Sequence, residues 1–410
     1  MLIADRRRLA TPSRKSSDLV ASGPWHAPET DNFPDRFPRN ARIACAMRTF
    51  ADFYAGRRVL ITGHTGFKGS WLLHWLEMLG AQVHGLSVDI PTNPSHFELT
   101  ALGSAATTQF RDIRDRTALA RALDEARPEV VFHLAAQPLV LRSYAIPLET
   151  LEVNVLGTAN LLEAIRAAGA PCAVVVATSD KCYANTGQVW GYRESDPMGG
   201  HDPYSMSKGA AELVVASWRD SYFAAPDSAI RLASARAGNV VGGGDWAADR
   251  LVVDGVRAIA AERPIVLRSP AATRPWQHVL EPLSGYLLLA ARLAQSGDPQ
   301  AFAQGWNFGP EPANVRPVRD VAAGLIAAFG KGEVVVEEDP AAPHEAFALA
   351  LDCDKAHRLL GWHPVWGFDE TIARTVEWYA RWQAGEADLR AVTRGQIEDY
   401  RIAADATANA

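Results

Sequence analysis

A short apolar run that leads into three spaced glycines constrains the fold of this chain more than any other feature. Residues 59–69 read VLITGHTGFKG, and a helical pattern of apolar residues follows directly, at positions 71, 72, 75, 76 and 79. A strand, a glycine loop and a helix in this order let the backbone approach a pyrophosphate at the positive end of the helix. The loop residues expected to contact a dinucleotide are Gly63, Thr65, Gly66, Phe67 and Gly69.

The next apolar run, residues 82–88, ends at an acidic residue. This residue, Asp89, stands 20 positions beyond Gly69. A carboxylate at this place can accept hydrogen bonds from the ribose hydroxyls of adenosine, and it repels a 2′-phosphate. The pattern therefore favours NAD over NADP. The alternative for Asp89 is a solvated loop carboxylate.

Strand and helix patterns keep alternating beyond Asp89, which predicts an α/β fold, a doubly wound parallel sheet with helices on both faces. We expect a strand end near 110–113, helices over 117–126 and 147–168, and buried strands over 129–136 and 173–177. Asn154 either orders the site or makes a plain helix contact. The strand ends add candidates for the cofactor site, with Asp112 placed toward the adenine amino group: Asp112, Ile113, Ala135, Ala136 and Gln137.

Tyr204 and Lys208 are four residues apart, which places them on one face of a helix. A tyrosine that acts as a base near pH 7 needs its phenolate stabilised by about 4 kcal/mol, and an ammonium about 4 Å away can supply much of this. Such a pair alone is more often an ordinary surface pair. It gains weight from Ser179, Asp180 and Lys181, which follow the strand predicted over 173–177 at the edge where open α/β sheets bind ligands. We take these five residues as catalytic candidates, with Tyr204 and Lys208 also at the cofactor.

Composition excludes several other classes of protein. The chain has 410 residues, 48% of them hydrophobic, which is enough for a large core, most simply in two lobes. Its net charge of −6 gives no general attraction to nucleic acid, and no apolar run is long enough to span a membrane. Four scattered cysteines and eleven histidines show no disulfide framework and no metal-ligand spacing. We expect reduced thiols, a cytoplasmic protein and no metal.

Six blocks of the sequence together resemble the extended short-chain dehydrogenase/reductases and, among them, the family of CDP-glucose 4,6-dehydratases. The blocks are GHTGFKGSW (63–71), TSDKCY (178–183), GYRE (191–194), DPYSMSKG (202–209), RAGNVVGGGDW (236–246) and RPWQH (274–278). The resemblance implies a Rossmann fold with a smaller C-terminal substrate-binding lobe. It also implies NAD as cofactor, CDP-glucose as substrate and a lyase that releases water.

The resemblance assigns a role to each catalytic candidate. The C5 proton of a hexose is not acidic, so the sugar is first oxidised at C4 and the hydride later returns at C6. Tyr204 would take the proton of the 4-hydroxyl, with Ser179 on the same oxygen and Lys208 beside the phenolate. A protonated Asp180 would donate to the departing 6-hydroxyl.

Lys181 departs from the wider dehydratase group, in which the thymidine-sugar and guanosine-sugar enzymes have a glutamate as the C5 base. It is similar to the cytidine-sugar enzymes at this position. A lysine serves as a base only if its pKa is depressed. Its role as proton acceptor or as electrostatic stabiliser of the enolate stays open, and a strand-end ion pair with Asp180 is the alternative without catalysis.

The resemblance also indicates how the chain is divided. We expect a disordered extension over 1–54, a NAD-binding domain over 55–236 with about 278–310, a nucleotide-sugar lobe over about 237–277 and 311–385, and a tail over 386–410. Asn239 and Arg274 are similar to residues that hold the diphosphate, and Arg250 is a weaker candidate. Lys68 can face either the pyrophosphate or the substrate.

Two other functions are compatible with the cofactor motif. A nucleotide-sugar epimerase or reductase shares Tyr204 and Lys208 but needs no acid beside C6, so Asp180 favours dehydration. A catalytically silent NAD-binding protein would usually lack one of Ser179, Tyr204 and Lys208, and all three are present. The resemblance further implies a homodimer in which the helix at 147–168 and the helix of Tyr204 form a four-helix bundle.

Overall fold

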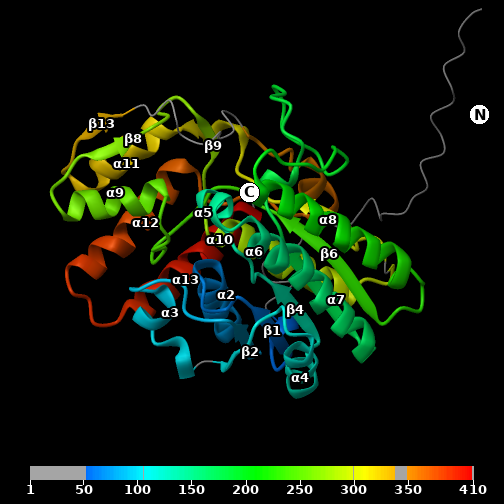
Figure 1. Ribbon diagram of the computed structural model, residues 1–410. Helices are drawn as coiled ribbons and strands as arrows, with labels where there is room; N and C mark the ends of the chain where they lie inside the picture. Colours follow the sequence, from blue (N-terminus) through cyan, green and yellow to red (C-terminus); the bar gives the residue numbers. More distant parts are fainter. Residues whose placement is uncertain (1–51, 105, 299, 338–348, 409–410) are drawn as a thin grey trace, which may run out of the picture. The chain divides into compact units, whose positions relative to one another are not determined.

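Seven strands, all paired in parallel, form the central sheet (Figure 1). The computed structural model describes residues 52–104, 106–298, 300–337 and 349–408. The order in the sheet is β11-β6-β5-β4-β1-β2-β3. The strands are β1 (Arg58–Thr62), β2 (Gln82–Ser87), β3 (Thr107–Phe110), β4 (Val130–His133), β5 (Cys172–Ala177), β6 (Ile230–Arg236) and β11 (Gly305–Asn307). The doubly wound fold expected from the sequence is confirmed.

Alternate residues of the central strands enter two separate hydrophobic cores. Val59 and Ile61 of β1 belong to one core, whereas Leu60 between them belongs to the other. The same alternation holds for β5, where Val175 lies in the first core and Val174 in the second. Both faces of the sheet are therefore covered, which explains why these strands read as continuous apolar runs.

Helices from distant parts of the chain cover the two faces (Figure 1). The core that contains Leu60 is closed by α4 (Arg116–Ala126), α7 (Gly157–Ala168) and α8 (Pro203–Tyr222). The core that contains Val59 is closed by α2 (Phe67–Met78), α10 (Leu280–Gln295) and α13 (Leu389–Ala408). The shorter helices α3 (His96–Leu99) and α5 (Val140–Ala145) lie in the loops that follow β2 and β4.

The helix expected over 147–168 is interrupted. It begins as α6 (Pro147–Leu151), passes through a π-helical turn over Glu152–Leu156, and continues as α7. Asn154 lies in the π-helical turn and is buried. Such turns are often found at functional sites because they redirect a side chain from the regular helix surface.

Short elements after β6 make the second, smaller group of packed segments. Its helices are α9 (Leu251–Ala260), α11 (Val318–Phe329) and α12 (Phe368–Gln383). Its strands pair two by two: β7 (Val240–Val241) with β10 (Gln277–His278), β9 (Thr273–Pro275) with β12 (Val315–Pro317), and β8 (Ile265–Leu267) with β13 (Val334–Val336). These segments come from the ranges expected for the substrate lobe.

Both expected boundaries of the folded part need correction. The expected tail over 386–410 contains α13, whose Ile397 and Tyr400 are fully buried, so this segment is part of the core. At the other end, Phe53 and Tyr54 are also buried. The expected extension therefore ends before Phe53, and residues 1–51 lie outside the described residues.

Candidate active site

A cleft of about 1430 Å³ lies over the carboxyl ends of the central strands. In the sheet, β2 and β3 lie on one side of β1, and β4, the next strand in the sequence, lies on its other side. The cleft thus lies at the point where the strand order reverses, the place at which open α/β sheets bind ligands. Every candidate from the sequence lines it: Gly63, Thr65, Gly66, Phe67, Gly69, Asp89, Asp112, Ile113, Ala135, Ala136, Gln137, Ser179, Asp180, Lys181, Tyr204, Lys208, Asn239, Arg250 and Arg274.

The glycine loop is tight enough to exclude side chains at two of its three glycines. A Cβ on Gly63, whose φ is +77°, would lie 2.7 Å from the backbone nitrogen of Ala135. A Cβ on Gly69 would lie 2.1 Å from the carbonyl oxygen of Gly63. The first glycine thus allows close passage over β4, and the third allows α2 to pack on the loop. This cradle fits a dinucleotide, with its pyrophosphate at the start of α2.

The acidic residues expected to bind the adenosine part of the cofactor follow the carboxyl ends of β2 and β3. Asp89 is exposed and lines the cleft, and its backbone carbonyl accepts a hydrogen bond of 2.6 Å from Thr65 Oγ1. Asp112 accepts hydrogen bonds from the Arg114 side chain, at 2.6 Å from Nη2, and this lowers the pKa of Asp112. The Asp112 carboxylate therefore already has a partner in Arg114, and the sequence did not indicate this ion pair.

Asn154 connects the end of β4 with the helix of Tyr204. Its Oδ1 accepts from the backbone nitrogen of Gln137 at 2.8 Å, and its Nδ2 donates to Gln137 O at 3.1 Å and to Ser207 Oγ at 2.8 Å. The Gln137 amide itself donates to Leu139 O and Thr150 Oγ1. Of the two interpretations left open for Asn154, the contacts favour one that orders the site.

Ser179, Asp180 and Tyr204 meet at the floor of the cleft. Ser179 Oγ donates to Asp180 Oδ1 at 3.0 Å, and Ser179 also hydrogen-bonds the Tyr204 hydroxyl. Asp180 is 1% exposed, and its second oxygen, Oδ2, is buried without a hydrogen-bond partner among the described residues. Lys181, in the same turn, is partly exposed and lines the cleft.

Burial dominates the acid–base properties of Tyr204 and Lys208. It raises the pKa of Tyr204 to about 12, although the Ser179 hydrogen bond and the charge of Arg250 act against this. It lowers the pKa of Lys208 to about 8, against the charge of Glu212. Asp180 and Arg250 are the charged side chains that act most on the phenol, while Lys208 Nζ lies 3.5 Å from Ala177 O, so the role of Lys208 toward Tyr204 stays a prediction.

Lys68 is a cation of the cleft whose position the sequence did not decide. Desolvation lowers its pKa to about 7, and the nearby cations Arg250 and Lys208 lower it further, whereas Asp180 and Asp245 raise it. Lys68 therefore lies among the charged residues of the catalytic end. Its proximity to Asp180 comes from the folding of two distant loops and has no sequence signal.

The three substrate candidates come from the segments after β6. Asn239 has a left-handed backbone, with φ of 36°, and Arg274 is a buried residue of β9. Arg250 forms an ion pair of 3.4 Å with the buried Asp245. Asp245 thus helps to position Arg250, and it is a candidate residue of the site that the sequence did not indicate.

Comparisons with known proteins agree with this geometry. Residues 60–375 match the family model of GDP-mannose 4,6 dehydratase. The CDP-glucose 4,6-dehydratase of Salmonella typhimurium is 48% identical over 355 residues, which is 86% of this chain and 98% of that protein. The chain belongs to this dehydratase family. The resemblance noted in the sequence is confirmed.

Solved structures of the dehydratase family and of related enzymes share the fold. A dTDP-glucose 4,6-dehydratase from Streptomyces venezuelae, crystallised with NAD, aligns with a TM-score of 0.69 and 25% identity over 81% of this chain and 99% of that one. An epimerase from Methanothermobacter thermautotrophicus aligns with a TM-score of 0.70 and 25% identity over 83% of this chain and 97% of that one. The fold is thus common to dehydratases and epimerases, and the site residues must distinguish them.

Two further findings concern the classes excluded from the sequence. In the described part of the chain, no helix combines the length and the apolarity needed to cross a membrane. Away from the cleft, Glu311, His357 and His363 place possible metal-binding atoms within 4.8 Å of one another. The two imidazole rings stack at an angle of 18°.

Proposed function

We propose that this dehydratase converts CDP-D-glucose into CDP-4-dehydro-6-deoxy-D-glucose and water, with NAD as its cofactor. The observation that carries the proposal is the buried carboxylate of Asp180 beside Ser179 and Tyr204. An epimerase needs no acid at this place. The identity of 48% with a CDP-glucose 4,6-dehydratase supports the choice of nucleotide.

The cleft has a suitable place for NAD. The loop of Gly63, Gly66 and Gly69 would hold the pyrophosphate, because its tightly packed backbone leads directly into the start of α2. Asp89 would bind the ribose hydroxyls of adenosine and disfavour a 2′-phosphate. When bound, NAD supplies a hydride acceptor for C4 of the sugar and a hydride donor for C6, so the reaction has no net change of oxidation state.

Tyr204 acts on the 4-hydroxyl of the sugar. Its oxygen takes the hydroxyl proton, while Ser179 Oγ holds the same sugar oxygen by a hydrogen bond. Because burial raises the pKa of the phenol, the phenolate needs a positive charge close by; Arg250 already acts in this direction, and the Lys208 ammonium would add to it when the substrate is bound. Burial lowers the pKa of Lys208 to about 8, so the ammonium form still predominates at pH 7.

Asp180 and Lys181 carry out the elimination. A carbonyl at C4 makes the C5 proton acidic, and Lys181 then either accepts this proton or stabilises the enolate. Asp180 would donate a proton to the departing 6-hydroxyl, and its Oδ2, buried without a hydrogen-bond partner among the described residues, is free to make this contact. The two side chains differ in exposure: Asp180 is buried, whereas Lys181 is partly exposed.

Cations on the other side of the cleft would bind the diphosphate. Arg274 and Arg250 lie on segments that face the strand ends, together with Asn239. Guanidinium groups suit this task, because they bind two oxygens in a fixed geometry. Lys68 adds a charge that depends on pH near 7.

We further propose a cytoplasmic homodimer. The helices expected to form its interface expose large apolar side chains, namely Leu148, Leu156, Met206, Leu213 and Tyr222. The second helix pair of a partner would cover this face and complete a four-helix bundle. Light scattering of wild type and of the double variant Leu156→Glu/Leu213→Glu tests the dimer: a variant that stays dimeric contradicts the interface.

The substrate is tested by incubating the protein and NAD separately with CDP-, dTDP-, GDP- and UDP-glucose. We expect mass spectrometry to show the loss of one water from CDP-glucose in preference to the others. A new isomer of unchanged mass would indicate an epimerase. An unchanged substrate in all four reactions, with NAD bound, would indicate a silent binding protein.

A further inference from the structure

Glu212 is a buried carboxylate one helical turn beyond Lys208. Tyr204, Lys208 and Glu212 follow one another at intervals of four residues on α8, so they lie along one face of the helix. Glu212 is 4% exposed. A charged carboxylate in such a place is costly unless several partners compensate for the lost water.

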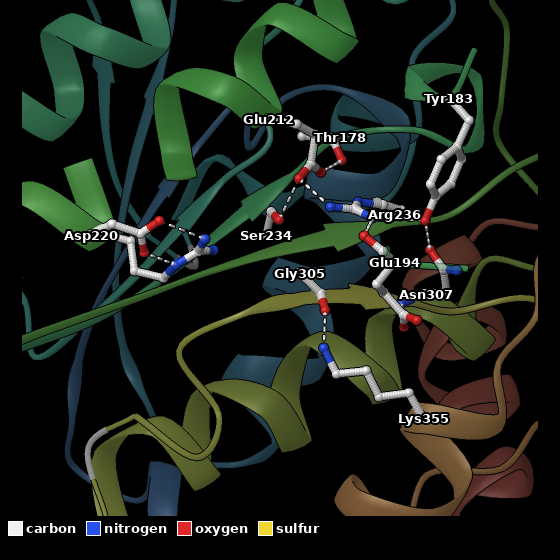
Figure 2. A network of polar contacts seen from close by, with 11 residues as sticks. Thr178, Tyr183, Glu194, Glu212, Asp220, Ser234, Arg236, Gly305, Asn307 and Lys355 are labelled. Carbon is white, nitrogen blue, oxygen red and sulfur yellow. Dashed lines mark hydrogen bonds and ion pairs between the residues drawn. The ribbon is translucent and has the colours of Figure 1, made fainter. Parts of the chain in front are cut away.

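Three side chains hold the Glu212 carboxylate in one orientation (Figure 2). Thr178 Oγ1 donates to Oε1 at 2.5 Å, while Ser234 Oγ and Arg236 Nη2 donate to Oε2, each at 2.7 Å. Burial acts to raise the pKa of Glu212, but the charge of Arg236 and these hydrogen bonds hold it below the ordinary value. Glu212 is therefore ionised at neutral pH.

Arg236 is itself fixed on the side away from α8. Its Nη1 donates to Tyr183 Oη at 2.7 Å, and Tyr183 Oη donates to Asn307 Oδ1 at 2.7 Å (Figure 2). Thr178 directly precedes Ser179. The network thus joins the end of β5, the strands β6 and β11, and α8, and it leaves Glu212 little freedom to move.

The groups around Lys208 explain what this carboxylate does. The neighbours that interact with Lys208 electrostatically are Glu212 on its own helix, Cys182 after β5, His133 on β4 and Lys68 at the start of α2. Burial raises the pKa of Cys182 and lowers that of His133 to about 3, so both are neutral at pH 7. Lys68 is a like charge. Among these groups, Glu212 alone supplies a negative charge.

We propose that Glu212 is a positioning residue that keeps Lys208 protonated at the end of β5, one helical turn from Tyr204. It touches neither the sugar nor the cofactor and acts through Lys208. The contribution of this step to catalysis rests on the proposed function, whereas the effect of Glu212 on Lys208 is a property of the protein alone. The two statements can be tested separately.

The test is a direct titration of Lys208 in the full-length protein. The chain has six lysines, so lysine labelled with ¹³C at the ε carbon gives few NMR signals, and Lys208→Met assigns the one of interest. We expect Glu212→Gln to lower the titration midpoint of Lys208 by about 1 pH unit. An unchanged midpoint in this variant would overturn the proposal.

Matched variants separate charge from packing. Glu281→Gln changes another fully buried glutamate, on α10, and should leave the Lys208 midpoint unchanged. Arg236→Met removes the cation that holds the pKa of Glu212 low, so Glu212 should take up a proton and the Lys208 midpoint should again move downward. If Glu212→Gln does not fold, Glu212→Gln/Arg236→Met avoids a buried unpaired charge and should still lower the midpoint. Equal downward shifts in all three single variants would contradict the role of charge.

Turnover gives the second readout. If Lys208 must be protonated, the alkaline limb of kcat/KM for CDP-glucose should move to lower pH in Glu212→Gln, by the same amount as the NMR midpoint. A shifted midpoint with an unmoved limb would remove the catalytic part of the inference. A wild-type protein that titrates as expected but does not convert CDP-glucose would refute the proposed function and leave the coupling intact.

Discussion

Gly238 lies against the carboxylate of Asp180 so closely that a Cβ at residue 238 would stand 1.8 Å from Oδ2. The same oxygen is buried without a hydrogen-bond partner among the described residues. Gly238 belongs to the turn after β6, whereas Asp180 follows β5, so two neighbouring strand ends define the position of the acid. The absence of a side chain at residue 238 is thus a requirement of the site.

Gly238→Ala should displace Asp180 and impair the elimination. A shift of about 1 Å in a catalytic group can reduce the rate roughly 100-fold, and we expect kcat to fall by at least this factor. Gly297→Ala is the matched control, because a Cβ there meets no atom within 4 Å. Steady-state kinetics together with a thermal melt decide the matter: a folded Gly238→Ala enzyme of normal activity would show that the position of Asp180 is unimportant.

Asp180→Asn and Lys181→Met should block the elimination at different points. The amide of Asp180→Asn cannot donate an acidic proton to the 6-hydroxyl, so we expect exchange of the C5 hydrogen with solvent deuterium but dehydration at least about 100-fold slower. Lys181→Met should lose both exchange and dehydration. NMR of the recovered sugar in D₂O measures both. Dehydration with normal C5 exchange in Lys181→Met contradicts the catalytic assignment of this lysine.

Asp89→Ala should relax the choice between the two nicotinamide cofactors. The substitution removes the charge that repels a 2′-phosphate but keeps the backbone carbonyl that Thr65 contacts. We expect the ratio of NADP to NAD affinity to rise about tenfold, as one removed like charge suggests. Titration with both cofactors measures the ratio, and Asp124→Ala, an exposed residue of α4, is the control. An unchanged ratio would assign Asp89 to the solvent.

The pH dependence of stability should reveal Glu281. This buried carboxylate accepts hydrogen bonds from the backbone nitrogens of Val365 and Trp366 and from Tyr400, yet burial raises its pKa to about 7. An unfolded glutamate titrates near about 4.3. The folded state therefore holds this proton more tightly, and its contribution is complete below about pH 4 and lost as the pH rises through about 7.

We expect this group to lower the free energy of unfolding by about 3 kcal/mol between pH 4 and pH 8. Urea unfolding over this range should show that Glu281→Gln removes that part of the slope, while Glu370→Gln at an exposed site retains it. Parallel pH profiles for wild type and Glu281→Gln would mean that Glu281 titrates normally.

The packing of α13 can be measured with two isoleucines on one helix. Ile397 is fully buried, whereas Ile402 is 60% exposed. Truncation of the first to alanine should cost about 2–5 kcal/mol, and truncation of the second should change stability by less than about 0.5 kcal/mol. Chemical denaturation of both variants compares them directly. Equal small effects would restore the interpretation of this segment as a tail.

The sequence predicted most of the sheet and the cleft because these depend on local patterns. The glycine loop, the apolar strands and the spacing of Tyr204 and Lys208 each lie within one short segment. Contacts between distant segments were missed for the opposite reason. Three examples are the proximity of Lys68 to Asp180, the ion pair of Asp245 with Arg250, and the buried hydrogen-bond partners of Glu212. The residues next to them in the sequence do not predict these contacts.

Other differences arise because an environment overrides a local preference. Burial raises the pKa of Tyr204, and the residues next to it in the sequence do not indicate this burial. The polar residues of α13 obscured its apolar stripe, and packing on α2 and α12 makes it part of the core. The π-helical turn at Asn154 is fixed by hydrogen bonds to Gln137 and Ser207, which lie in other elements.

An intramolecular dehydration moves one hydrogen atom from C4 to C6 of the sugar, and a deuterium label can follow this atom. CDP-glucose deuterated at C4 is incubated with the protein and NAD in ordinary water, and the product is analysed by NMR and mass spectrometry. The account predicts a product lighter by one water, with the deuterium at C6 and a hydrogen from solvent at C5. A product of unchanged mass, or one from which the deuterium has been lost to solvent, would contradict it.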